Sequence, residues 1–268
     1  MNKFLVRQRA IVSRLVIVVS VLAASTLGLM NAASAASPVF DWTGFYVGAN
    51  VGYGWGNSDA NLTFSDSGGV LFNASGNIKA TGAIGGGGGG YNWQSGQWVF
   101  GIEADLQWSG QKGSQDFVCP AGTCNGLAVT ASVTEKLEWF GTVRPRAGWL
   151  VTPTTLVYAT GGLAYGKVDE SGIVTNGVLT TPFDFSRTSV GWVVGAGVEG
   201  QLSGNWNWKV EYLYLQLREP DGSVATTITF RTPVTVEIDP IFHDNIIRVG
   251  LNYKFGAEPE PKRLLITK

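Results

Sequence analysis

Apolar and polar side chains alternate along most of this chain. In WVFGIEADLQW, residues 98–108, every even position is apolar, whereas the odd positions include Gly, Glu, Asp and Gln. A repeat of two residues predicts a β-strand with one apolar face. Together with a glycine-rich segment, the same pattern gives eight strands, an even number. The other seven are expected at 44–55, 82–94, 137–151, 156–166, 190–202, 206–214 and 246–255.

The connections between these segments are alternately short and long. Tight turns of Gly, Ser, Asn, Pro and Thr are expected at 94–96, 152–154 and 203–205, and long connections at 57–77, 109–132, 169–188 and 218–244. This succession is typical of bacterial outer-membrane barrels, which have short periplasmic turns and longer external loops. We therefore predict an all-β fold, an eight-stranded antiparallel up-and-down transmembrane β-barrel with both termini in the periplasm.

The aromatic residues support a membrane rather than a water-facing barrel. Trp98 and Trp108 are ten residues apart on one strand, as are Trp139 and Trp149 on the next. Ten residues at ~3.3 Å each, tilted by about 40°, span roughly 25 Å, the height of an outward apolar band. A soluble lipocalin-like carrier would place its apolar side chains inside, the reverse of this pattern. Two aromatic belts are expected from Trp42, Trp55, Trp93, Trp98, Trp108, Trp139, Trp149, Trp192, Trp206, Tyr253 and Phe255.

The first residues have the features of an export signal. A basic start precedes the apolar stretch at 15–30, and Ala33-Ser34-Ala35 fits a signal-peptidase site. We expect a cleaved signal peptide at 1–35, a barrel domain at 36–256 and a short periplasmic tail at 257–268. The net charge of −1 gives no electrostatic reason to expect a nucleic-acid partner, and the pattern calls for no cofactor.

Charged residues fall on the predicted inner face. An eight-stranded barrel is only wide enough to be filled by its own side chains. Unpaired charges there would be costly, so these residues are expected to pair with one another. The alternative is a narrow, porin-like channel for small solutes through the same residues. The expected interior network comprises Glu103, Asp105, Glu138, Arg144, Arg146, Glu199, Lys209, Glu211, Arg248 and Lys254.

Two smaller groups of residues suggest further chemistry. Some eight-stranded barrels modify lipids, and His243 with Asp244 and Ser186, Ser189 or Ser223 would offer the residue types of a hydrolase. Adjacent residues on a strand point in opposite directions, however, so Asp244 is poorly placed to orient His243, and we expect no catalytic site. Cys119 and Cys124 are the only cysteines, and in an oxidising periplasm they are expected to form a disulfide; a metal site would need two more ligands.

Several segments resemble a known family. FDWTGFYVGANVGYGWG (40–56), GYNWQ (90–94), LVYATGGLAYG (156–166) and RVGLNYKF (248–255) are similar to the 25/31-kDa outer-membrane proteins of Brucella and rhizobia, which are opacity-like, OmpA-type barrels. The resemblance implies a porin-family barrel with variable surface loops and envelope-integrity or surface-antigen roles. It also implies contact with outer-membrane lipid, lipopolysaccharide and the barrel-assembly machinery, with extracellular ligands binding through the loops. Two departures are Gly88, where relatives often have Gln, and the tail after Phe255.

The run of six glycines at 85–90 has three interpretations. A flexible linker does not fit its place between a long connection and a tight turn. A phosphate-binding loop is disfavoured because no Lys-Ser or Lys-Thr pair follows it. A strand that lacks side chains on both faces remains, and we expect its inner face to make room for bulky neighbours such as Tyr46.

Overall fold

The computed structural model describes residues 40–124, 128–218, 224–230 and 232–255. The predicted signal peptide, the predicted tail and Ser223 lie outside these residues. Within the described ranges, no helix is both long enough and apolar enough to cross a membrane.

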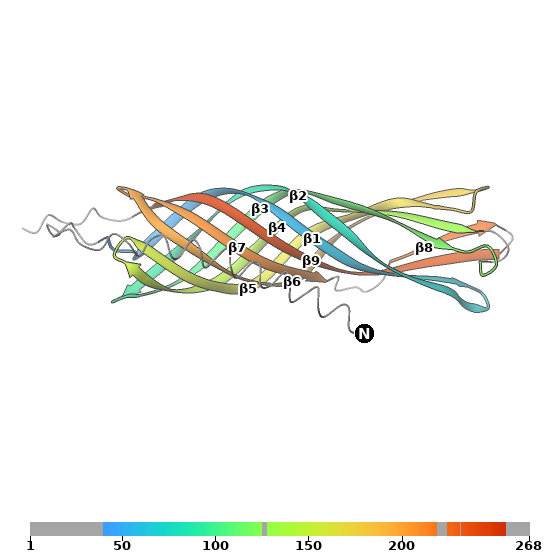
Figure 1. Ribbon diagram of the computed structural model, residues 1–268, viewed down its shortest axis with the longest axis horizontal. Helices are drawn as coiled ribbons and strands as arrows, with labels where there is room; N and C mark the ends of the chain where they lie inside the picture. Colours follow the sequence, from blue (N-terminus) through green and yellow to red (C-terminus); the bar gives the residue numbers. More distant parts are fainter. Residues whose placement is uncertain (1–39, 125–127, 219–223, 231, 256–268) are drawn as a thin grey trace, which may run out of the picture. The chain divides into compact units, whose positions relative to one another are not determined.

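Residues 44–254 form one antiparallel sheet that closes on itself (Figure 1). Each strand pairs with the next, and β1 pairs with β9 from Tyr46↔Lys254 upward. β7 and β8 pair with successive parts of β9, so together they occupy a single position in the ring. The ring therefore has eight positions, as the alternation predicts. The strands are β1 Gly44–Asp66, β2 Gly69–Ser95, β3 Trp98–Cys119, β4 Val129–Thr152, β5 Thr155–Thr175, β6 Thr180–Ser203, β7 Trp206–Arg218, β8 Val224–Phe230 and β9 Thr232–Lys254.

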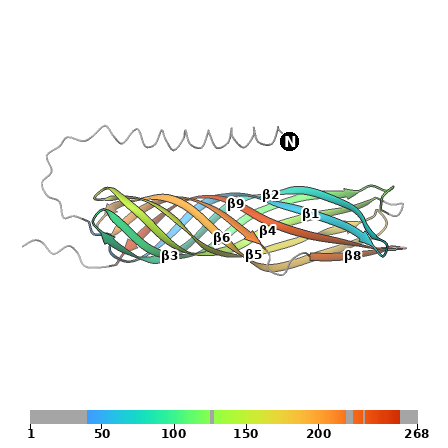
Figure 2. The same ribbon diagram turned by 90° about the horizontal axis from the view of Figure 1, so that it is seen from below.

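The predicted long loops are wrong in one respect, because most of their residues are strand. β1 and β2 run on to a turn between Asp66 and Gly69, and β5 and β6 run on to a short turn between Thr175 and Thr180. Figure 2 shows these hairpins extending the barrel wall at the end that lies away from the short turns. We call this end the hairpin end, and the end with the short turns the turn end.

The hairpins remain ordered because they bury a core of their own. Leu62 and Phe64 of β1 are fully buried, although the composition of the segment is rich in Ser, Thr and Asn. Every second residue of each extension points inward, so a few apolar side chains are enough to fill the space. We call this set the hairpin core. It consists of Leu62, Phe64, Ile78, Phe117, Cys119, Cys124, Val129, Ala131, Val133, Val174 and Phe183.

Below the hairpin core, the barrel interior is filled in layers. Reading the inward residues of β4 from the turn end gives Leu150, then Arg146 and Arg144, then Phe140 and Leu137. Other strands repeat this order, so an apolar turn-end plug, a charge layer and a middle apolar layer are stacked along the axis. The turn-end plug is Phe40, Trp42, Val99, Leu150, Leu156 and Tyr158. The middle apolar layer is Ala80, Ile84, Leu137, Phe140, Ala164, Val168, Val193, Leu213, Leu215, Leu217, Phe242 and Ile246.

The outer face of the wall carries the aromatic belts. At the turn end, Trp98 contacts Trp149 edge to face across β3 and β4, with ring centroids 4.9 Å apart. At the other level, Trp108 is directly opposite Trp139 in the same pair of strands. The outward, solvent-accessible aromatic side chains that the sequence assigned to belts are Trp55, Trp93, Trp98, Trp108, Trp139, Trp149, Trp192, Trp206, Tyr253 and Phe255.

Trp42 is an exception, and its assignment to a belt is wrong. Its side chain is only 1% exposed and belongs to the turn-end plug. The indole nitrogen donates to the carbonyl of Pro153 at 3.3 Å, and the backbone nitrogen donates to Oε1 of Gln94. Because Trp42 precedes β1, which begins at Gly44, the alternation of the strand does not determine its direction. The chain instead folds into the mouth of the barrel.

The six glycines form part of β2, paired on both sides. Gly85 to Gly90 lie opposite Val51 to Tyr46 of β1 and opposite Trp108 to Glu103 of β3. A Cβ atom at the inward Gly88 would come within 2.5 Å of the carbonyl oxygen of Ala104, and one at Gly90 within 2.6 Å of the Tyr46 hydroxyl. At the outward Gly85, the nearest atom would be 3.8 Å away. The inward glycines therefore let the strands and the interior side chains approach closely.

Candidate functional site

The charge layer is built around the carboxylate of Glu103, which β3 directs into the barrel. Its oxygens accept hydrogen bonds from Arg144 at 2.6 Å and from Lys209 at 2.9 and 3.0 Å. The hydroxyl of Tyr46 donates to it at 2.7 Å. Each partner comes from a different strand, since Arg144 lies on β4, Lys209 on β7 and Tyr46 on β1. Glu103 thus ties together opposite sides of the wall.

A second set of contacts surrounds Arg248 of β9. Its guanidinium lies 2.5 Å from Glu211 of β7 and 2.9 Å from Asp105 of β3. Asp105 is shared, because Arg144 also reaches it at 2.9 Å. Tyr158 donates its hydroxyl to the other oxygen of Glu211 at 2.8 Å. The planar guanidinium groups suit this bridging because each has several donors in fixed directions.

Arg146 closes the layer toward the turn end. Its guanidinium forms an ion pair with Glu199 of β6 at 3.0 Å, and its Nε donates to Asn92. The same group lies between two aromatic rings, 4.9 Å from the centroid of Tyr46 and 5.0 Å from that of Tyr158. Such stacking on aromatic faces partly replaces the water that a buried cation loses.

The charges of this layer balance. Four carboxylates, Glu103, Asp105, Glu199 and Glu211, face four cations, Arg144, Arg146, Lys209 and Arg248, and all eight are at most 7% exposed. Buried ions lose hydration, which costs several kcal/mol each, and mutual attraction offsets that cost only when the hydrogen bonds are well satisfied. The eight charges therefore neutralise one another, although four guanidinium nitrogens have no hydrogen-bond partner among the described residues: Nε and Nη1 of Arg144, Nη2 of Arg146 and Nη1 of Arg248.

Two residues assigned to this network lie elsewhere. Glu138 faces outward, because a β-bulge between Leu137 and Trp139 shifts the register of β4 against β5 and turns Leu137 into the barrel instead. Lys254 points toward the interior but lies at the turn-end mouth, where its ammonium contacts the carbonyl of Asp41 and lies 4.8 Å from the ring centroid of Phe40. Among the residues with described positions, Lys254 pairs with no carboxylate.

A small cavity lies beside the charge layer, against the inner face of the glycine strand. Gly48, Asn50 and Gly88 line it together with Glu103 and Asp105. It has room for about one water molecule. Oδ1 of Asn50 is buried there without a hydrogen-bond partner in the described part of the chain. The sequence offered one hint of this space, the absence of inward side chains at Gly86 and Gly88.

The candidate hydrolase residues do not come together. His243 lies on the outer face of the barrel, where its Nδ1 is 2.9 Å from the hydroxyl of Tyr214. Asp244 points inward, is fully buried and accepts a hydrogen bond from Gln111 at 2.8 Å. The two side chains are therefore on opposite sides of the wall, as expected for neighbours on a strand. Within the described ranges, no group of three His, Cys, Asp or Glu residues could hold a metal ion.

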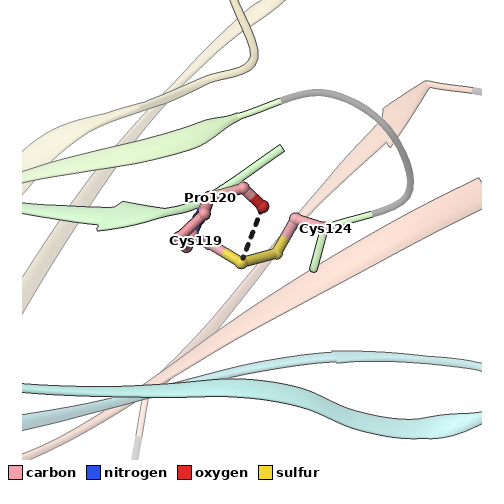
Figure 3. Close-up of a disulfide and its surroundings, with 3 residues drawn as sticks. All are labelled: Cys119, Pro120 and Cys124. Atoms are coloured by element: carbon pink, nitrogen blue, oxygen red, sulfur yellow. Dashed lines mark hydrogen bonds between the residues drawn. A yellow bond between two sulfur atoms is a disulfide. The ribbon is translucent and has the colours of Figure 1, made fainter. Parts of the chain in front are cut away.

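Cys119 and Cys124 form a disulfide in the β3–β4 hairpin (Figure 3). Their Cα atoms are 6.1 Å apart. The carbonyl of Pro120 accepts hydrogen bonds from the backbone nitrogens of Thr123 and Cys124, which fixes the turn between the two cysteines. Both cysteines are buried in the hairpin core. The bridge therefore joins the turn to that core rather than capping an exposed loop.

The chain is similar in sequence to a known protein family. The profile of the outer membrane protein beta-barrel domain matches residues 19–255. The chain belongs to this outer-membrane β-barrel family. The 31 kDa outer-membrane immunogenic protein of Brucella melitensis biotype 1 is 37% identical over 240 residues, with 88% of this chain and 94% of the relative covered.

Two further relatives have different names, and one of them comes from another genus. The 25 kDa outer-membrane immunogenic protein of Brucella abortus biovar 1 is 31% identical over 219 residues, and 82% of each chain is covered. The 22 kDa outer membrane protein of Rhizobium leguminosarum bv. viciae is 30% identical, with 81% of this chain and 80% of the relative covered. The family resemblance seen in the sequence is thus confirmed, and the outer membrane is the location that family membership and these names support.

Proposed function

We propose that this outer-membrane barrel is a non-conducting structural protein of the envelope, whose hairpin end faces the outside and provides its interaction surface. The filling of its interior supports this proposal most strongly. The turn-end plug, the charge layer and the middle apolar layer follow one another along the axis, and each contains side chains that are almost inaccessible to solvent. A solute would have to displace all three layers in turn.

The charge layer alone argues against conduction by small ions. Arg144 and Arg248, at 0% and 1% exposure, lie across the interior and form ion pairs with Glu103, Asp105 and Glu211. Opening a path would require breaking several buried ion pairs at once, and each broken pair would leave uncompensated buried charges. Side chains fill a barrel of this size, whereas open channels have about sixteen strands.

The same geometry supports a non-enzymatic role. His243 bonds to Tyr214 on the outer wall, and Asp244 faces the opposite way, so the only histidine of the chain has no catalytic partner among the described residues. With the short turns in the periplasm, the hairpin core would lie outside the cell. The chain termini would then both be periplasmic.

Single-channel recording in planar bilayers tests this proposal. We expect purified protein to give no stable conductance steps, while a general porin inserted under the same conditions serves as the positive control. Reproducible steps of porin size from the wild-type chain would refute the proposal and favour the small-solute channel. A deletion strain should in addition lose resistance to detergents while keeping normal uptake of small solutes. Normal detergent resistance with impaired uptake would also contradict a structural role.

A further inference from the structure

One buried acid lies outside the charge layer, in an apolar part of the barrel interior. Asp244 of β9 points inward between Phe242 and Ile246. Leu215 of β7 is directly opposite it, and these three neighbours belong to the middle apolar layer. Asp244 is 0% exposed and forms no ion pair with a described residue. Burying a carboxylate without a cation is so costly that such a group shifts its pKa and becomes neutral instead.

Gln111 of β3 is the polar partner of Asp244. Its side-chain nitrogen Nε2 donates to Oδ2 of the carboxyl group at 2.8 Å, and Gln111 is also 0% exposed. The contact joins two strands that β1 and β2 separate in the ring. Glycines of β1 leave room for it, because a Cβ atom at Gly54 would overlap the side-chain amide of Gln111 and one at Gly56 would lie 3.1 Å from Oδ1 of Asp244. The pair therefore occupies a space that the sequence of β1 keeps free of side chains.

Two oxygen atoms of this pair have no hydrogen-bond partner among the described residues. They are Oδ1 of Asp244 and Oε1 of Gln111, and both are buried. If the carboxyl group were ionised, both atoms would be acceptors and neither could satisfy the other. A neutral carboxyl group has one O–H donor, and an amide and a carboxylic acid can exchange two hydrogen bonds. A single proton therefore satisfies both oxygens and removes the cost of leaving them unpaired.

The strands beside Asp244 bring no cation to it. Its inward neighbours on β1, β2 and β7 are Gly, Ser, Ala, Ile and Leu residues, and His243 lies on the outer face. On the turn-end side, the nearest ionisable groups along the interior are those of the charge layer, such as Asp105 of β3 and Arg248 of β9. Toward the hairpin end, the other inward ionisable side chains with described positions come from β4, β5 and β6, across the interior: Glu135, Glu170 and Arg187.

Asp244 lies one residue beyond the aromatic belt at the hairpin end. Its neighbour Asn245 is directly opposite Trp55 of that belt, and Asp244 is the next residue toward the hairpins. Burial raises the pKa of the Asp244 carboxyl to about 7, and the hydrogen bonds from Gln111 and from the backbone of Asn245 oppose this shift only in part. The group therefore changes its charge near neutral pH, where an exposed aspartate is ionised.

We propose that Asp244 and Gln111 form a proton-dependent lock inside the barrel, which joins β9 to β3. With the proton bound, the carboxyl group donates to Oε1 of Gln111 and accepts from Nε2. Loss of the proton to water removes the first of these hydrogen bonds and leaves a negative charge in the middle apolar layer. Because the pKa of Asp244 is higher in the folded barrel than in the unfolded chain, the stabilisation is fully present below the unfolded value of about 4 and is lost as the pH rises through about 7. The lock is independent of the proposed function, since it requires neither a closed pore nor a particular orientation in the membrane.

Urea titration of the full barrel in lipid vesicles, repeated across a range of pH, tests the lock. The folding equilibrium constant of wild type should fall about tenfold between about pH 6 and about pH 8. Asp244→Asn offers Gln111 an amide donor at every pH, so this variant should lack the fall and should be more stable than wild type at the higher pH. Asp184→Asn, which changes an exposed carboxylate on β6, serves as the matched control and should follow wild type.

Infrared spectroscopy of the folded barrel observes the proton itself. The C=O stretching band of a neutral carboxyl group should be present in wild type at about pH 6 and fade by about pH 8. The same pH-dependent band should be missing from Asp244→Asn and present in Asp184→Asn. Equal pH dependence of stability in wild type and Asp244→Asn would overturn the proposal, and so would the absence of a neutral carboxyl band from wild type at the lower pH.

Discussion

Replacing Glu103 by Gln tests whether charge balance holds the barrel interior together. Four cations, Arg144, Arg146, Lys209 and Arg248, lie within 3.5 Å of its carboxylate. Glutamine keeps the volume but removes the charge and replaces one acceptor oxygen by a donor, which leaves four buried cations against three carboxylates. Removing one partner of a buried ion pair costs about 3–5 kcal/mol, and we expect a loss of this size in the free energy of unfolding.

A second substitution in the same layer should reverse part of this loss. The ammonium of Lys209 contacts Glu103 and no other carboxylate within 4.0 Å among the described residues. Lys209→Met combined with Glu103→Gln restores equal numbers, three cations and three carboxylates. The double variant should therefore be more stable than Glu103→Gln alone, with a coupling energy of about 2 kcal/mol between the two sites.

Urea titration of the barrel refolded in lipid vesicles provides the measurement, with tryptophan fluorescence and heat-modifiable migration on gels as the two probes. Asp116→Asn, which changes an exposed carboxylate on the same strand, should leave the midpoint close to that of wild type. Additive losses from the two interior substitutions would refute the reasoning, because they would show that the layer does not respond to its net charge. An unchanged midpoint for Glu103→Gln would refute it as well.

A further prediction concerns the glycine strand. Gly88→Ala should slow or prevent refolding, because its Cβ would lie 2.5 Å from the carbonyl oxygen of Ala104. Gly85→Ala, whose Cβ would be 3.8 Å from the nearest atom, should refold normally. Heat-modifiable migration on gels measures the folded fraction of each variant, and equal behaviour of the two would contradict the packing argument.

Strict alternation explains why so much of the wall could be predicted from the sequence. On β3 and β7, each inward polar residue and each outward apolar residue follows from a period of two without interruption. Residues such as Glu103 and Lys209 were therefore assigned to the interior correctly by parity alone. Their individual partners could not be derived in this way, because the pairing of Glu103 with four cations depends on distances across the barrel.

The errors occur where the period breaks. The bulge at Leu137–Trp139 places Glu138 and Trp139 on the same face, and no Gly or Pro lies at residues 137–139 to indicate it. Trp42 precedes the first strand, so a belt and a plug are equally compatible with its sequence position. The hairpin extensions were interpreted as loops because Ser, Thr, Asn and Gly are common in both, whereas their inward residues, such as Leu62 and Phe64, carry the signal of a strand.

The bulges that interrupt the alternation also change which charged side chains lie on the outer face. Without the shift between Trp108 and Gln111, Lys112 would not stand opposite Lys136, and Glu138 would face the interior with the other carboxylates. The interior would then carry one more acid, in addition to the four of the charge layer and the buried Glu135, Glu170 and Asp244. One local irregularity thus moves a negative charge from the lumen to the wall. It adds no further acid to the interior, and it places Glu138 between Lys136 and Lys167 on the outer face, where its carboxylate forms an ion pair with each of them.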